Sequence, residues 1–305
     1  MKTSVVLSVF NRPKTTRKVF EAVREAKPNK LFIIADGPRR DRLGEAEECL
    51  AVRKIFDDVD WECQVLKNFS DVNLGLEKRI VSGLDWVFEQ VDCAVILEDD
   101  CLPNPSFFRF CTELLEKYED DENIFALTGH NHLGEWQTSR SSYFFANYFD
   151  CWGWATWRRT WQKFDSEMKS WGDLEAREKV RSTIADDQQF YNRARVLNMA
   201  YEGKVNSWAY PFFFMSLLHG GLTITPSKNL IQNIGFDDAA SNTRNKNDKR
   251  GKVEAYELKF PLVHPTEIEA DRQYDYLRYK KVWKRTFRKR ALKTIRSLKK
   301  RIMQK

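Results

Sequence analysis

The chain has 305 residues, of which 42% are hydrophobic and 13% are aromatic. This length can bury a full core and fits one large α/β domain or two small ones, and the aromatic content argues against disorder. With 13 Gly and 9 Pro, the chain is neither collagen-like nor of low complexity. The longest apolar run, residues 209–218, has about half the length of a membrane span. The N-terminus shows no signal-peptide pattern, so we expect a cytoplasmic protein.

The net charge of +7 is unevenly distributed. Residues 278–305 contain 14 Lys or Arg and no acid, so the other 277 residues hold 37 basic and 44 acidic groups and carry a net charge of −7. The basic character therefore belongs to the tail, and we expect no nucleic-acid partner for the body. The six cysteines form no CxxC pair and are expected to be reduced thiols.

Strand-like and helix-like segments alternate through the first third of the chain. Short apolar runs predict strands, and the longer stretches between them have a helical pattern. In chain order we expect strand 4–10, helix 15–26, strand 31–35, helix 42–56, strand 61–66, helix 76–91 and strand 94–97. This order predicts an α/β fold with a Rossmann-like, doubly wound and mostly parallel sheet.

The rest of the chain is less regular. Residues 143–161 are rich in aromatic side chains, 187–200 have a helical pattern, 209–218 are apolar, and 229–252 are polar and rich in Asn. From Trp283 to Ile302, apolar residues recur every three or four positions among Lys and Arg, which predicts a basic amphipathic helix. We therefore divide the chain into a body, residues 1–265, with halves 1–102 and 103–265, and a basic C-terminal tail, residues 266–305.

Polar residues directly follow three of the expected strands. These clusters are Asn11-Arg12, Asp36-Gly37 and Glu98-Asp99-Asp100. In a doubly wound sheet, ligands bind at the carboxyl ends of the parallel strands. We therefore expect the three clusters to converge on one ligand site.

The three consecutive acids place like charges at the end of a buried strand, where they repel one another. A divalent cation would relieve this repulsion, and carboxylate oxygens suit Mg²⁺ or Mn²⁺. The alternative is a solvated loop or helix start without a metal, since acids are also favoured at helix N-termini. Asp36 alone predicts either a plain β-turn or an acceptor of hydrogen bonds from a nucleotide base.

Four other polar residues have both a structural and a chemical interpretation. Arg79, on the third expected helix, either marks an ordinary loop-to-helix junction or faces the sheet edge. Asp187 opens a helix and is either part of an N-cap pair or a general base. His130 and His132 have no third ligand at a convincing spacing, so we interpret them as loop or supporting polar residues. The sequence contains no P-loop, GxGxxG, GxSxG or HExxH motif.

Taken together, these motifs resemble a known fold. Asn-Arg-Pro after the first strand, Ala-Asp-Gly at the second and Ile-Leu-Glu-Asp-Asp at the fourth are similar to the nucleotide-diphospho-sugar transferase fold, the A-type glycosyltransferase fold. The likeness is closest to N-acetylglucosaminyltransferase I-like enzymes, through residues 103–118, 148–154 and 186–187, and looser to family 2 glycosyltransferases. It covers roughly residues 3–240. It makes 1–102 the nucleotide-binding half and 103–265 the acceptor-side half.

The resemblance implies roles for the residues on the donor side. Asp36 would bind the nucleotide base, which we expect to be uracil. Arg12 would lie near the nucleotide, and Arg79 would contribute to the same substrate site. Asp99 would contact the ribose, and Glu98 would touch the donor sugar.

The resemblance also implies a metal and an acceptor side. Asp100 would ligate Mn²⁺ or Mg²⁺, and Asp187 would deprotonate the acceptor hydroxyl. Trp154 would belong to the aromatic substrate-binding segment, and residues 233–243 would order over the donor. The implied activity is inverting, metal-dependent transfer of a hexosyl or N-acetylhexosaminyl group from a UDP-sugar to a glycan or lipid-linked acceptor. The alternative is a non-catalytic glycan- or membrane-binding module on the same fold.

The basic tail suggests a further partner. Residues 282–305 are expected to lie on an anionic membrane surface, which would make the protein peripheral on the cytoplasmic face. The alternative is a helix that docks on the body through its apolar side chains.

Overall fold

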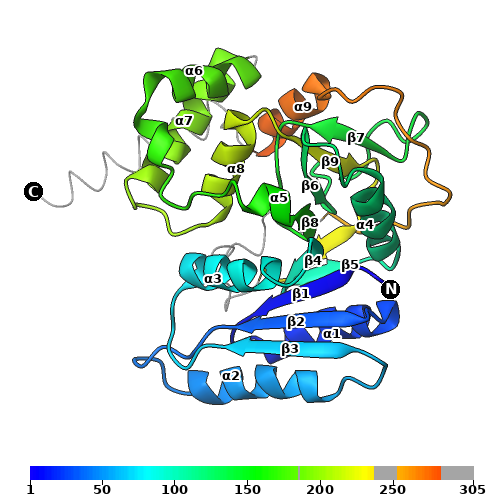
Figure 1. The fold of residues 1–305 in the computed structure, drawn as a ribbon, viewed down its shortest axis with the longest axis vertical. Helices are drawn as coiled ribbons and strands as arrows, with labels where there is room; N and C mark the ends of the chain where they lie inside the picture. Colours follow the sequence, from blue (N-terminus) through cyan, green and yellow to red (C-terminus); the bar gives the residue numbers. More distant parts are fainter. Residues whose placement is uncertain (185, 237–252, 283–305) are drawn as a thin grey trace, which may run out of the picture.

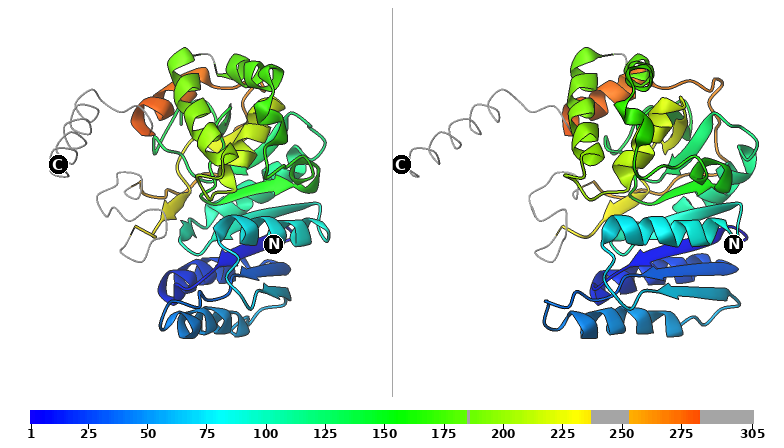
Figure 2. Two further views of the ribbon diagram at one scale, coloured as in Figure 1. Left: turned by 90° about the vertical axis from the view of Figure 1, so that its left-hand side faces the viewer. Right: turned by 60° about the vertical axis from the view of Figure 1, so that its left-hand side comes forward.

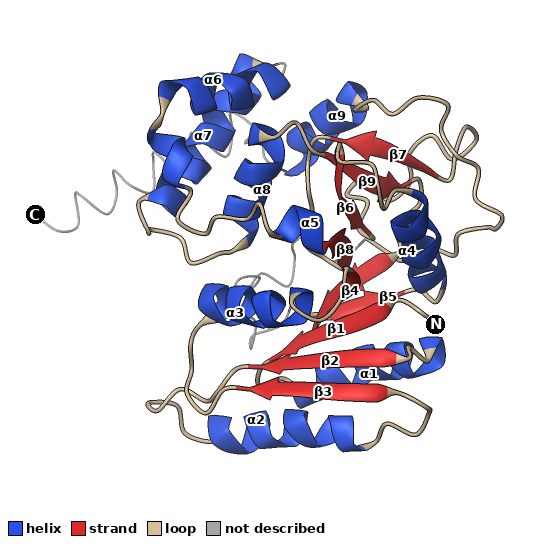
Figure 3. Cartoon of the chain, in the orientation of Figure 1, coloured by secondary structure: helices blue, strands red, loops and turns tan. Residues whose placement is uncertain are grey.

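The computed structural model describes residues 1–184, 186–236 and 253–282. Its centre is an eight-stranded sheet, coloured red in Figure 3, and Figure 1 labels its strands. From one edge to the other the order is β3 (Gln64–Phe69), β2 (Lys30–Ala35), β1 (Ser4–Val9), β4 (Cys93–Glu98), β8 (Trp154–Trp157), β6 (Ile124–Thr128), β9 (Leu222–Pro226) and β7 (Tyr143–Ala146). The predicted α/β, Rossmann-like fold is confirmed.

The first four strands of this order are parallel, and β8 enters antiparallel between β4 and β6. Because β4 and β6 both run antiparallel to β8, they share one direction. The carboxyl ends of β1, β2 and β3 point to the left in Figure 1. The structure therefore has one edge at which the ends of β1, β2, β4 and β6 can contribute to a common site.

Helices cover both faces of the sheet. They are α1 (Pro13–Ala26), α2 (Glu45–Lys54), α3 (Leu76–Phe88), α4 (Ser106–Lys117), α5 (Arg158–Trp161), α6 (Leu174–Thr183), α7 (Asp187–Tyr201), α8 (Ala209–Leu218) and α9 (Arg272–Val282). Val5 and Leu7 of β1 pack into the core shared with α1, α2 and α4, whereas Val6 packs into the core shared with α3, α5 and α8. The apolar run in β1 therefore reflects burial on both faces, as is typical of parallel strands.

Two expected elements are placed differently in the structure. The third strand was expected at residues 61–66 but lies at Gln64–Phe69, because Trp61 instead donates a hydrogen bond to the Pro28 carbonyl oxygen and packs beside Phe20. The helix expected at 42–56 begins at Glu45, after Gly44 in the left-handed region (φ +81°), and ends in a 3₁₀ turn, Ile55–Asp57. Local apolar pattern misplaced both ends of these elements, although it identified their type.

A second, two-stranded sheet joins distant parts of the chain. Its strands are β5 (Cys101–Pro103), just after the three acids, and β10 (Ile231–Asn233). The pairing is antiparallel and places Asn233 opposite Cys101. Of the loop predicted over the donor, residues 233–236 therefore lie beside the acids, and residues 237–243 fall outside the described residues.

The first part of the predicted tail packs on the body. Helix α9, orange in Figure 2, lies against the upper half of the molecule. Tyr274 is buried beside Phe144, with 4.5 Å between the ring centroids. Asp275 accepts hydrogen bonds from the Asn147 backbone and side chain, both at 3.0 Å. The rest of the predicted amphipathic helix, residues 283–305, lies outside the described residues.

No helix among the described residues is both long and apolar enough to cross a bilayer. All six cysteines are free thiols, as expected.

Candidate active site

The acidic cluster, Glu98, Asp99 and Asp100, lies at the carboxyl end of β4, next to the end of β1. Asp99 and Asp100 are 3% and 8% exposed. Arg12, between β1 and α1, forms ion pairs with both, and its Nη1 lies 3.0 Å from Asp100 Oδ2. The structure therefore brings together two of the three predicted strand-end clusters.

Burial and mutual repulsion dominate the electrostatics of the acidic cluster. Burial, with the neighbouring Asp100 and Asp99 charges, raises the pKa of Glu98 to about 8. Burial raises the pKa of Asp99 to about 6, although the Arg12 charge acts in the opposite direction. The single guanidinium group thus leaves the cluster with excess negative charge, which a divalent cation would offset.

The chain segment after β10 covers Asp100. The Ile234 backbone N–H donates to the Asp100 carbonyl oxygen at 2.8 Å, and Asn233 Nδ2 lies 3.3 Å from Asp100 Oδ1. At Gly235, an added Cβ would lie 2.1 Å from Asp100 Oδ2 and 2.7 Å from Arg12 Nη1. Any larger residue here would require the Asp100 carboxylate or the Arg12 guanidinium to move. The sequence marked this segment as a loop but did not single out Asn233 or Gly235.

Asp36, at the end of β2, holds the neighbouring loop in place. Its carboxylate accepts four hydrogen bonds at 2.9–3.0 Å, from the backbone N–H groups of Gly37, Leu74 and Gly75 and from Asn73 Nδ2. These occupy the acceptor positions of a carboxylate. In the structure Asp36 therefore positions the loop that precedes α3, and its predicted contact with a base stays a prediction.

Arg79 extends from α3 to the end of β3. It is buried and donates to the Asn68 carbonyl oxygen and to Asn68 Oδ1, both at 2.7 Å. Burial lowers the pKa of Arg79, and the Asp36 charge acts against that shift. Arg79 thus lies near Asp36. The contacts described for Arg79 include Asn68 but not the acidic cluster.

Trp154 is a core residue of β8. Its side chain has no exposed area, and it stacks on Trp208 with 5.0 Å between the ring centroids. All four residues of this strand are buried. The role of Trp154 in substrate binding stays a prediction. Trp152, two residues earlier, is only partly buried and lies against His130 and Phe236.

Asp186 and Asp187 both lie at the N-terminus of α7 but make different contacts. Asp186 caps α7, since its carboxylate accepts a hydrogen bond from the Gln189 backbone N–H at 2.7 Å. The Asp187 side chain is 83% exposed and pairs with Arg181 at 3.0 Å. The contacts described for Asp187 do not include the acidic cluster, so its role as a base stays a prediction.

His130, His132 and Asp150 form a second buried polar group, the histidine–aspartate cluster. His132 Nε2 is hydrogen-bonded to Asp150 Oδ2, and His130 Nδ1 lies 3.6 Å from Asp150 Oδ1. Burial lowers the pKa of His132 to about 3. Burial would raise the pKa of Asp150, but the two histidines hold it well below its usual range. The sequence did not indicate Asp150 as a partner of the two histidines, because it lies on a different segment.

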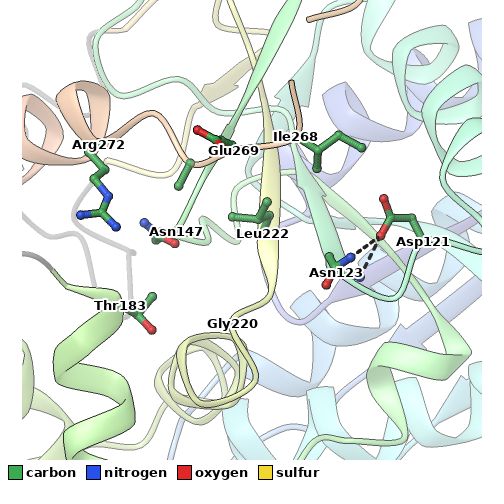
Figure 4. A pocket seen from close by; sticks show the side chains of 10 residues that line it. Asp121, Asn123, Asn147, Thr183, Gly220, Leu222, Ile268, Glu269 and Arg272 are labelled. Atoms are coloured by element: carbon green, nitrogen blue, oxygen red, sulfur yellow. Dashed lines mark hydrogen bonds between the residues drawn. The ribbon is translucent and has the colours of Figure 1, made fainter. Parts of the chain in front are cut away.

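A separate cavity of about 600 Å³ lies at the opposite edge of the sheet (Figure 4). Asn123 immediately precedes β6, and Leu222 begins β9, so these residues mark the amino ends of their strands. The acids lie at the carboxyl end of β4, which runs in the same direction. This cavity is therefore not part of the candidate active site.

Similar proteins were found among solved structures but not among curated proteins. No curated protein matches the chain. Among solved structures, a mannosyltransferase from Pyrobaculum calidifontis in complex with GDP-Man and Mn²⁺ is 11% identical, covers 72% of this chain and 69% of its own, and has a TM-score of 0.40. A UDP-glucose pyrophosphorylase in complex with UDP-glucose is 10% identical, covers 76% and 93%, and has a TM-score of 0.39. Such distant likenesses identify neither a donor nor an acceptor.

The family comparison is more informative. The family model described as "Glycosyl transferase family 2" matches residues 4–174, which is more than half of the chain. This range contains β1, β2 and β4, and therefore Arg12, Asp36 and the acidic cluster. The likeness to family 2, which was the looser one in the sequence, is thus the one confirmed. The chain belongs to glycosyl transferase family 2.

Proposed function

We propose that the protein transfers a sugar from a nucleoside-diphosphate sugar, with UDP as the expected nucleotide, to an acceptor hydroxyl with inversion of the anomeric carbon. The observation that carries the proposal is the buried acidic cluster at the carboxyl edge of the sheet, paired with Arg12 and covered by Gly235. A donor bound at this edge would place its diphosphate against groups that favour a cation and a phosphate. Within the family, we propose that the protein is similar to N-acetylglucosaminyltransferase I-like enzymes and that it transfers a hexosyl or N-acetylhexosaminyl group.

The oxygen atoms available at Asp100 suit Mn²⁺ or Mg²⁺ as metal ligands. Its carboxylate oxygens are hard donors, and Asp99 adds negative charge beside them. When bound, the cation would offset the charge that develops on the departing nucleoside diphosphate. Arg12, which pairs with Asp99 and Asp100, would lie near the donor phosphates. Asp99 would contact the ribose and Glu98 the donor sugar.

On the acceptor side, we propose that Asp187 accepts the proton of the attacking hydroxyl. Its carboxylate is exposed at the first turn of α7, where an acceptor can reach it. A single displacement needs only this one carboxylate and inverts the anomeric carbon. The acceptor would be a glycan or a lipid-linked sugar.

The test compares Asp187→Asn with Glu178→Gln, since both acids pair with Arg181. Transfer from a panel of nucleotide sugars is measured with and without Mn²⁺. We expect Asp187→Asn to lose at least about a hundredfold in transfer rate while UDP affinity changes little, and Glu178→Gln to behave like wild type. Wild-type transfer by Asp187→Asn would place the base elsewhere. Nucleotide binding without turnover of any donor would favour the non-catalytic module.

A further inference from the structure

The histidine–aspartate cluster has the composition of a cation site and plays no part in the proposed transfer. His130 and His132 follow β6, and Asp150 lies in the segment before β8. One ligand atom from each residue lies within 4.8 Å of the others. His130 is 1% exposed and His132 is 6% exposed, so the imidazoles do not face bulk solvent.

A second observation points to a ligand. His130 Nδ1 is buried and has no hydrogen-bond partner among the described residues. The facing oxygen, Asp150 Oδ1, lies 3.6 Å away, beyond hydrogen-bond distance, and already accepts the Trp152 backbone N–H at 3.1 Å. A buried polar atom without a partner costs roughly 1–3 kcal/mol. A cation between the imidazole and the carboxylate would remove this cost.

We propose that His130, His132 and Asp150 bind a transition-metal dication of the Zn²⁺ class, at a site separate from the Asp100 cation. Two imidazole nitrogens and one carboxylate oxygen suit Zn²⁺ or Co²⁺, whereas Mg²⁺ prefers oxygen ligands only. The ion would replace the proton that lies between His132 Nε2 and Asp150 Oδ2. This inference goes beyond the proposed function and does not depend on it.

The balance of charges around the histidine–aspartate cluster is compatible with a bound dication. Arg278 of α9 pairs with Asp150 Oδ2 at 3.1 Å and also donates to the Phe149 carbonyl oxygen at 3.0 Å. The second contact keeps the guanidinium anchored if the metal takes over the carboxylate oxygen. The acidic cluster lies close enough for the charge of Asp150 to act on Glu98. The acidic cluster and Asp150 together carry four carboxyl groups against the two guanidinium groups of Arg12 and Arg278.

The experiment uses the full chain, freed of metal by chelation and then titrated with Co²⁺, whose visible absorption reports nitrogen ligation. The test variants are His130→Gln and His132→Asn. His264→Asn is the matched control, because that histidine also accepts or donates one side-chain hydrogen bond, to Tyr143, outside the cluster. The variant Asp100→Asn tests whether Co²⁺ binds at the acidic cluster instead.

We expect one Co²⁺ to bind with a visible band that excess Zn²⁺ removes and excess Mg²⁺ does not. The affinity should fall at least about tenfold in His130→Gln and His132→Asn and stay unchanged in His264→Asn and Asp100→Asn. Unchanged Co²⁺ affinity in both test variants, or loss of binding in Asp100→Asn alone, would overturn the proposal. If the variants do not fold, X-ray absorption of the Zn²⁺-loaded wild type decides: two imidazole ligands support the site, and fewer than two contradict it.

Discussion

Arg12 connects two of the strand-end clusters because β1 and β4 are neighbours in the sheet. Its guanidinium contacts both Asp99 and Asp100. The two carboxylates raise the pKa of Arg12 although its burial has the opposite effect, so the residue stays charged. It therefore holds together a cluster whose three acids would otherwise repel one another.

Asp36 provides a test at the scale of one side chain. Asn offers one acceptor oxygen where Asp offers two, so Asp36→Asn leaves at least one N–H of residues 37 or 73–75 without its acceptor. We expect the free energy of unfolding to fall by about 1–3 kcal/mol in urea denaturation. Asp71→Asn, on an exposed residue of the same segment, should change it little. Loss of nucleotide affinity with unchanged stability would contradict the positioning role and favour direct contact with the base.

From the sequence, contacts could be predicted between residues that follow neighbouring strands of the sheet. Three acids after a buried parallel strand, and an Arg after another, were enough to predict that Arg12 and the acidic cluster meet. Asp150 was out of reach, because its pairing with His132 depends on the antiparallel entry of β8 beside β6. The burial of Trp154 was also out of reach, because local pattern does not distinguish a strand buried on both faces from an aromatic binding segment.

At the scale of elements, two glycines allow neighbouring segments to pack closely. At Gly83 of α3, an added Cβ would lie 2.6 Å from Ile34 side-chain atoms, so glycine lets this helix lie directly on β2. At Gly37, a Cβ would lie 2.5 Å from the Val72 backbone. Gly83 therefore has a packing role between α3 and β2.

The docking of α9 makes a prediction about pH. Burial raises the pKa of Asp275 from 3.8 to about 6, although the Asn147 backbone hydrogen bond acts against that shift. Since the folded pKa lies above the unfolded one, the folded chain binds the proton more tightly. The contribution of Asp275 to stability is therefore full below about pH 4 and is lost as the pH rises through 6.

We expect Asp275→Asn to remove this dependence. Between pH 4 and pH 7, wild type should lose up to about 3 kcal/mol of unfolding free energy relative to the variant. Glu267→Gln, on an exposed residue before α9, serves as the control and should follow wild type. Parallel pH profiles for wild type and Asp275→Asn in chemical denaturation would show that the carboxyl group does not titrate in this way.

Most elements of the first third could be predicted, since buried parallel strands are continuous apolar runs and helices α1 and α3 are amphipathic. The bounds of β3 were misplaced because it is an edge strand whose residues include Gln64 and Lys67 and whose burial is partial. The small sheet of β5 and β10 was not predictable. It joins three-residue strands that are far apart in the chain, and strands this short leave no periodic signal.

At the scale of the whole molecule, positive charge is concentrated in the C-terminal tail. We propose that the tail binds an anionic membrane and brings the enzyme to a lipid-linked acceptor. The full chain should cosediment with vesicles that contain anionic lipid at low salt, and a chain that ends at Val282 should not. Neither should bind neutral vesicles. Equal cosedimentation of the two chains would remove the membrane proposal without affecting the donor site.

The central claim is that the acidic cluster forms a metal-dependent nucleotide site, and calorimetric titration of UDP with and without Mn²⁺ tests it most directly. Wild type, Asp100→Asn and Asp92→Asn are compared, since Asp92 is an exposed acid just before the same strand. We expect Mn²⁺ to be required for tight UDP binding, Asp100→Asn to weaken it at least about tenfold, and Asp92→Asn to leave it unchanged. UDP affinity that is the same without Mn²⁺, or the same in Asp100→Asn, would contradict the account.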